Sequence, residues 1–222
     1  MSKRFKRHLV LFLFSVILTA VFFYILPSKN PVFKTSMATA YGGLFLVSLT
    51  LVIGPWNIIF GRPNPVSSYL RRDIGIWAGI LAIVHTIVGL QVHMGGKFWL
   101  YFIPDPKGSH LLPIRLDVFG FTNHSGLVAI LIFILLLSLS NNYSLKKLGA
   151  LRWKKFQKWN YAIAGLVLFH GIIYQVLEKR SLGYSVIFAI PFLLILFFQI
   201  WGYRVQLKKE VCTLDALSGT KM

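Results

Sequence analysis

Acidic residues are scarce in this chain and absent from its apolar segments. Only six of the 222 residues are Asp or Glu, against 24 Lys and Arg. The six are Asp73, Asp105, Asp117, Glu178, Glu210 and Asp215, and each lies outside the long apolar runs. A proton-coupled transporter commonly carries a carboxylate inside the membrane, and a hydrolase needs paired carboxylates or a Ser-His-Asp set. The sequence therefore argues against both classes.

Cysteine and nucleotide-binding motifs are lacking as well. The single cysteine, Cys212, leaves no disulfide framework, no covalent haem-attachment motif and no iron–sulfur site. No strand–GxGxxG–helix unit is present, and the segment after Arg204 is too short for a nucleotide-binding domain. Electron transfer remains compatible with these absences, because a bound cofactor performs that chemistry without a protein acid or nucleophile.

Long apolar runs are what the chain has in abundance, with 56% hydrophobic residues and a mean hydropathy of +0.67. Six apolar segments cover residues 9–26, 37–60, 74–93, 125–140, 159–177 and 183–203, the fourth extending at its outer end to Thr122. A membrane-spanning helix needs ~20 apolar residues, and backbone groups in lipid must be satisfied within the segment. The sequence predicts an all-α integral membrane protein, a six-transmembrane-helix bundle forming one domain over 1–222, with residues 204–222 as a short cytoplasmic tail.

The distribution of basic residues predicts the orientation. Seventeen of the 24 fall on one side if the N-terminus is cytoplasmic: Lys3, Arg4, Lys6, Arg7, Arg62, Arg71, Arg72, Lys146, Lys147, Arg152, Lys154, Lys155, Lys158, Arg204, Lys208, Lys209 and Lys221. The other seven are Lys29, Lys34, Lys97, Lys107, Arg115, Lys179 and Arg180. The positive-inside rule then places both termini in the cytoplasm, in the cell (inner or plasma) membrane. The net charge of +18 therefore indicates topology and contact with anionic lipid rather than nucleic-acid binding.

Two histidines lie at matching depth in two different apolar segments. His85 and His170 each lie eleven residues after the start of their run, at Ile74 and Trp159. That spacing is about 16 Å at 1.5 Å per residue, near the middle of a ~30 Å hydrocarbon core. Neutral imidazoles at one level of a helix bundle suit bis-histidine ligation of a haem between the third and fifth helices. The competing interpretation is two independent interior histidines, each hydrogen-bonded to a neighbouring helix.

Further candidates flank this pair. Basic residues near a buried haem often neutralise its propionates. The candidates on the inner side, which topology also explains, are Arg71, Arg72, Arg152 and Lys155, and those on the outer side are Lys97 and Arg115. His93 and His124 lie near the outer interface and, with His110, form a candidate site for a second haem, a metal or a quinone. Interfacial histidines are also common without any ligand. Glycines along the third and fifth predicted helices would leave room for a flat haem between them, but ordinary helix packing also explains these glycines.

Two motifs resemble a known family. The first reads RRDIGIW from Arg71 to Trp77, followed by LAIVH ending at His85. The second reads RWKKFQ from Arg152 to Gln157, leading to His170. Together they resemble ferric reductase-like transmembrane domains, and are most similar to the haem-binding membrane subunit of bacterial methionine sulfoxide reductase systems, over residues 41–203.

The resemblance implies a b-type haem with His85 and His170 as axial ligands. Gln157 stands where relatives in the sulfoxide-reductase branch carry a further histidine, so one haem is expected rather than two. Without a fused flavin–nicotinamide domain, electrons would come from quinol, a separate reductase or a bound flavin. They would pass to an extracytoplasmic oxidoreductase or ferric complex. We therefore expect the electron-transfer subunit of an oxidoreductase. The alternative is a haem-free polytopic membrane protein, such as a small permease or assembly factor, with structural histidines.

Overall fold

The computed structural model describes residues 3–63, 69–105 and 112–219, and side chains as far as residue 212. Within these residues the chain is entirely helical, as predicted, with seven α-helices and two short 3₁₀ turns. They are α1 (Lys3–Ile25), α2 (Pro31–Ile59), α3 (Tyr69–Gly89), η1 (Met94–Gly96), η2 (Phe98–Tyr101), α4 (Val118–Leu139), α5 (Asn142–Gln157), α6 (Trp159–Leu177) and α7 (Leu182–Gly219).

Six segments of the described chain are long and apolar enough to cross a membrane, as the hydropathy predicts. The fifth of them joins α5 and α6 in one stretch, Asn142–Leu177. Two boundaries differ from the sequence prediction. Residues 142–157, expected as a connection, form α5, and residues 204–219, expected as a tail, continue α7 as helix.

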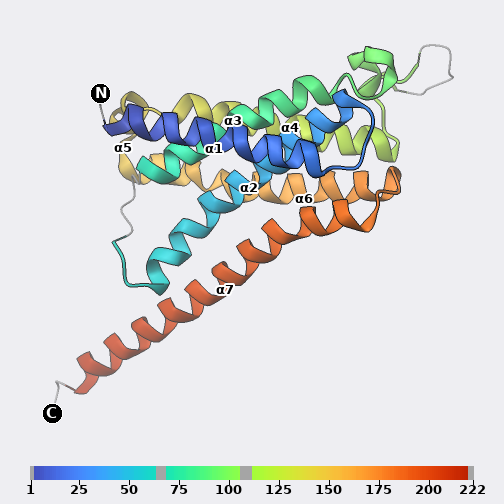
Figure 1. The fold of residues 1–222 in the computed structure, drawn as a ribbon. Helices are drawn as coiled ribbons and strands as arrows, with labels where there is room; N and C mark the ends of the chain where they lie inside the picture. The colour runs from blue at the N-terminus through green and yellow to red at the C-terminus, as the bar shows by residue number, and fades with distance from the viewer. Residues whose placement is uncertain (1–2, 64–68, 106–111, 220–222) are drawn as a thin grey trace.

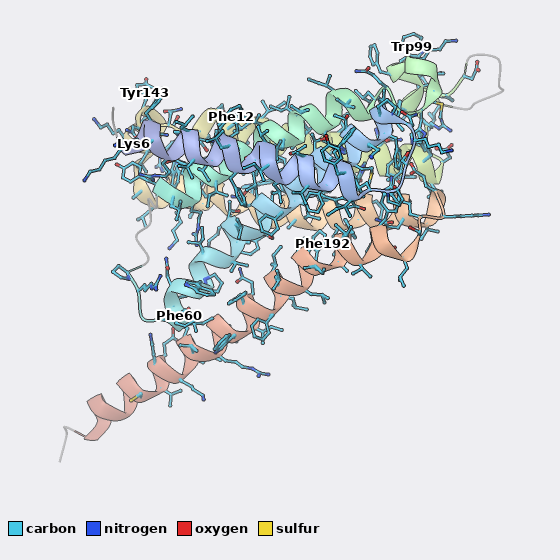
Figure 2. All side chains as sticks on the ribbon, viewed as in Figure 1. Lys6, Phe12, Phe60, Trp99, Tyr143 and Phe192 are labelled. Atoms are coloured by element: carbon cyan, nitrogen blue, oxygen red, sulfur yellow. The ribbon has the colours of Figure 1, made fainter. Side chains whose placement is uncertain are left out.

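The bundle has two ends that are convenient to name (Figure 1). The loop end holds η1, η2 and the turns at residues 26–30 and 178–181, and the terminal end holds the start of α1 and α5. Figure 2 shows Lys6 and Tyr143 at the terminal end and Trp99 at the opposite one. Helices alternate in direction between these ends, and α7 leaves the bundle obliquely toward the C-terminus (Figure 1).

Side-chain caps fix where three helices begin. The Asn30 Oδ1 atom accepts hydrogen bonds from Val32 N at 2.9 Å and Phe33 N at 3.2 Å, at the start of α2. Asp117 and Asn141 cap α4 and α5 in the same way, each accepting from a backbone N–H at 2.7 Å. These caps satisfy N–H groups that a helix N-terminus leaves unpaired. Both α2 and α4 begin at the loop end, and α2 packs against α3 and α4 against α6. The caps of α2 and α4 therefore help to fix where these two helices start beside their neighbours.

The most buried helix of the bundle is α2, with 72% of its apolar window inside the protein, against 6% for α1. Glycines bring its neighbours close. A Cβ atom built on Gly43 would lie 3.6 Å from Ala78 O of α3, and one on Gly79 would lie 2.9 Å from Leu137 Cδ1 of α4. These contacts identify both glycines as helix-packing positions. The exposed apolar side chains of the outer helices, such as Phe12 on α1 (Figure 2), suit contact with lipid.

One ion cluster joins α1 to α3 near the terminal end. The Asp73 carboxylate has no solvent exposure and lies 3.3 Å from Arg4 Nη2, 3.2 Å from Arg7 Nη1 and 3.4 Å from His8 Nε2. A buried carboxylate is stable only when paired, so these contacts hold the N-terminal helix against α3. Part of the N-terminal basic cluster, which the sequence explained by topology alone, therefore also serves packing.

Candidate functional site

A cavity of about 260 Å³ lies inside the bundle, and both His85 and His170 line it. Its walls come from five helices: α2, α3, α4, α6 and α7. The lining is mostly apolar, with aliphatic and aromatic side chains such as Leu44, Ile130 and Phe133. Concave, largely apolar pockets with a few convergent polar groups are the usual form of a cofactor site.

The cavity occupies a gap between α3 and α6. Among the described residues, no Cα atom of α3 lies within 8 Å of a Cα atom of α6, whereas α2 packs against α3 and α4 against α6. Directly packed helices have axes about 8–10 Å apart, and their Cα atoms approach more closely than that. The two histidines therefore reach into a space that α3 and α6 leave between them.

The imidazole of His85 is oriented by α2. Its Nδ1 atom lies 2.9 Å from the backbone carbonyl oxygen of Ser36 and 3.2 Å from the Ser36 hydroxyl. A carbonyl oxygen only accepts, so Nδ1 carries the proton and donates. The Nε2 atom then bears the lone pair, as a metal-ligating imidazole requires. Gly89, one turn along α3, adds to this arrangement, because a Cβ atom there would lie 3.3 Å from the Ser36 hydroxyl.

The imidazole of His170 is held in the same way by α4. Its Nδ1 atom lies 2.8 Å from the carbonyl oxygen of Thr122 and therefore donates to it. This approach depends on Gly126, the residue one helical turn after Thr122. A Cβ atom at Gly126 would lie 2.9 Å from His170 Cε1 and 3.0 Å from Nδ1, closer than such atoms pack. Gly126 is a site residue that the sequence reasoning missed, because its partner lies on another helix.

Both Nε2 atoms remain available. In the described part of the chain, no side chain or backbone group forms a hydrogen bond with Nε2 of His85 or His170. The same residues contain no group of three or more His, Cys, Asp or Glu side chains that could hold a metal ion. A metal bound here would have to bring most of its ligands with it, as the iron of a porphyrin does. The donor set and the walls of the cavity fit a haem.

The two histidines lie at different distances from the ends of their helices. His85 lies four residues before the end of α3, toward the loop end, whereas His170 lies seven residues before the end of α6 (Trp159–Leu177), near the middle of that helix. The α3 helix begins at Tyr69, before the start of the apolar run at Ile74, and stops at Gly89. The apolar run continues to residue 93 without staying helical.

The loop side of the cavity is polar. His93 Nε2 lies 2.9 Å from Glu178 Oε1, and the Arg180 guanidinium lies 2.9 Å from Glu178 Oε2. We call these three residues the polar end; all of them line the cavity. Burial raises the pKa of Glu178, but the His93 hydrogen bond and the nearby charge of Arg180 outweigh it, so the pKa lies below its usual value. Tyr101 closes this side by accepting from His93 N at 2.9 Å and donating to Gly89 O at 3.1 Å.

The other sequence-predicted candidates are distributed differently. His93 joins the main cavity rather than a second site. His124 does not line it; its ring lies 5.6 Å from that of Phe102, and its buried Nε2 has no hydrogen-bond partner among the described residues. His110 lies outside the described residues.

None of the basic residues considered for the haem propionates lines the cavity. Arg71 approaches Gly54 of α2, Arg72 lies 5.0 Å from the Tyr69 ring, and Arg152 is exposed on α5. The arginine that does line the cavity is Arg180, which the sequence placed only among the basic residues of the opposite side. Its only sequence signal is its position two residues after Glu178, directly past an apolar run that carries a candidate histidine, and that position alone does not assign a role.

The comparison with known proteins agrees with the resemblance seen in the sequence. The chain is 24% identical over 182 residues to the protein-methionine-sulfoxide reductase heme-binding subunit MsrQ of Polaromonas naphthalenivorans (strain CJ2). The alignment covers 82% of this chain and 76% of that protein. No family model and no solved structure matches the chain. The resemblance to the haem-binding subunit of methionine sulfoxide reductase systems is thereby confirmed, at low identity but over most of the chain.

Proposed function

We propose that this multi-pass membrane protein binds one b-type haem through His85 and His170 and relays electrons across the membrane. One observation carries the proposal. Each imidazole donates from Nδ1 to a backbone carbonyl of a different helix, which leaves two Nε2 lone pairs at one apolar cavity. Two independent structural histidines would need neither matched tautomers nor a shared cavity.

The haem, when bound, supplies the one-electron chemistry, and the protein holds it. The carbonyls of Ser36 and Thr122 fix the rotation of the two rings and increase the basicity of Nε2. Leu44, Ile130 and Phe133 give the cavity apolar walls, and an apolar surrounding helps to set the reduction potential of a haem.

The direction of transfer follows from the distribution of charge. With the basic terminal end in the cytoplasm, the loop end is extracytoplasmic, and the cavity lies nearer to it. A haem there would pass electrons to an extracytoplasmic oxidoreductase. The relative is named as a subunit of a sulfoxide reductase, which supports a separate partner. Electrons would enter from the cytoplasmic side through quinol, a separate reductase or a bound flavin.

A count of one haem is part of the proposal. Relatives carry a further histidine at one position where this chain has Gln157, the last residue of α5. Its Nε2 atom is buried without a hydrogen-bond partner among the described residues, and an amide nitrogen has no lone pair to offer to iron.

The test is the haem content of His85→Ala and His170→Ala, each purified in detergent and quantified as the pyridine haemochrome. Both variants should insert normally and lose haem, because a single remaining imidazole holds the iron from one side only. His124→Ala serves as the matched control, since His124 is a histidine of the same bundle outside the cavity. Haem content equal to the unmodified protein in both variants would remove the ligand assignment. A colourless unmodified protein from haem-supplied cells would favour the haem-free alternative.

A further inference from the structure

The cavity has a charged side, and Arg180 is its cation. Among the described residues that line the cavity, the charged ones other than histidine are Glu178 and Arg180. Both follow the end of α6 at Leu177, in the short turn that leads to α7. The remainder of the lining is apolar, aromatic or neutral, so a ligand in the cavity would meet full charges on this side alone.

Arg180 is held in a fixed orientation. Its side chain is only 10% exposed. Its Nε and Nη2 atoms both lie 2.9 Å from Glu178 Oε2, and its guanidinium lies 5.7 Å from the ring centres of Phe33 and Tyr174. Glu178 therefore engages one edge of the guanidinium and does not engage Nη1. The aromatic rings hold its plane, as they commonly do for arginine.

Glu178 itself is fully engaged. Its Oε1 atom accepts from His93 and its Oε2 atom from Arg180. The Glu178 carboxylate thus positions Arg180 and at the same time accepts a hydrogen bond from His93. An acidic ligand group reaching this side of the cavity would meet a preoriented cation, and charge-assisted hydrogen bonds of this kind are among the stronger ones.

We propose that Arg180 binds a propionate carboxylate of the haem, with Glu178 and His93 as its positioning residues. This inference rests on the proposed function. It assigns the acid-binding role to a residue outside the sequence-predicted candidates, none of which lines the cavity. A haem bound in this way has its ring between α3 and α6 and its acidic edge toward the α6–α7 turn.

The experiment combines a protein variant with a ligand variant. The protein, purified from haem-limited cells, is titrated with haem b and with haem b dimethyl ester, in which both propionates are esterified. Arg180→Gln is compared with the unmodified protein. Lys179→Gln is the matched control, because Lys179 is an exposed cation one residue away. Arg180→Lys tests how far charge alone restores binding.

We expect Arg180→Gln to weaken binding of haem b roughly ten- to a hundredfold, the effect of a lost hydrogen bond to a charged group. The dimethyl ester should bind the unmodified protein with a similar loss, and the variant should show little further loss with the ester. The Lys179→Gln protein should behave as the unmodified one, and Arg180→Lys should fall between.

Three results would overturn the inference. They are equal haem b affinity in Arg180→Gln and Lys179→Gln, fully additive effects of the substitution and of esterification, and undiminished binding of the ester by the unmodified protein. The last needs no variant, so it decides the matter even if Arg180→Gln folds poorly. In each case the unmodified protein still binds haem, which leaves the proposed function standing. Failure of the unmodified protein to bind haem b would instead reject the proposed function.

Discussion

Gly126→Ala is the substitution that probes the proposed haem site most selectively, since it adds one methyl group beside His170. The added Cβ atom would lie 2.9 Å from His170 Cε1 and 3.0 Å from Nδ1. Ordinary contacts between such atoms are about 3.5–4.0 Å, so the ring must retreat by several tenths of an ångström. That movement stretches the 2.8 Å hydrogen bond from Nδ1 to Thr122 O and turns Nε2 away from its ligand position.

Two opposing effects determine how the substitution changes haem affinity and the stability of the bundle. Loss of a hydrogen bond that orients a metal-bound histidine typically lowers affinity about 10- to 100-fold. Replacing a helical glycine by alanine favours the helix itself by up to about 1 kcal/mol. Gly126→Ala should therefore lose haem affinity while the bundle keeps or slightly gains thermal stability. A general folding defect would lower both.

Gly165→Ala is the matched control, because Gly165 is an exposed glycine of α6, the helix that carries His170, and a Cβ atom there meets nothing within 4 Å. The assay is haem titration of each purified variant, followed at the Soret band, together with thermal unfolding of the haem-free protein. Equal haem affinity in the two variants would refute the reasoning, since only one of them crowds the histidine.

Two further predictions concern the ends of the bundle. The lowered pKa of Glu178 means that its ion pairs stabilise the fold above its usual pKa of about 4.5, and that this stabilisation is lost as the pH falls through the lower folded-state value. Thermal unfolding should therefore show a fall in stability on acidification that Glu178→Gln reduces, and an identical pH profile would contradict it. At the other end, Asp73→Asn should destabilise the protein by about 1–3 kcal/mol, a discounted figure because Arg4 and Arg7 are partly exposed. Glu210→Gln, at an exposed site of α7, should change little in the same unfolding measurement.

Much of the fold follows from hydropathy, because each spanning helix must be apolar along its length. The sequence identified all six spanning segments of the described chain, including α4 with its extension to Thr122. It missed α5, which is basic and on average polar and therefore gives no membrane signal of its own. It also ended the last helix at residue 203, because the polar residues that follow looked like a tail, although they continue α7.

The site was only partly predictable for a different reason. His85 and His170 stand out, since ionisable residues are rare in apolar segments. Gly126 and Arg180 do not, because their roles depend on which helices become neighbours. Hydropathy also places the start of the apolar run at Ile74, whereas α3 already includes Tyr69.

The most direct test of the account is the absorption spectrum of the purified, unmodified protein, oxidised and dithionite-reduced, with haem counted against protein by pyridine haemochrome. The account predicts one haem b per chain, with the sharp α and Soret bands of six-coordinate, bis-histidine iron in the reduced state. A preparation from haem-supplied cells with no Soret band, or with the spectrum of five-coordinate iron, would contradict the pairing of His85 with His170.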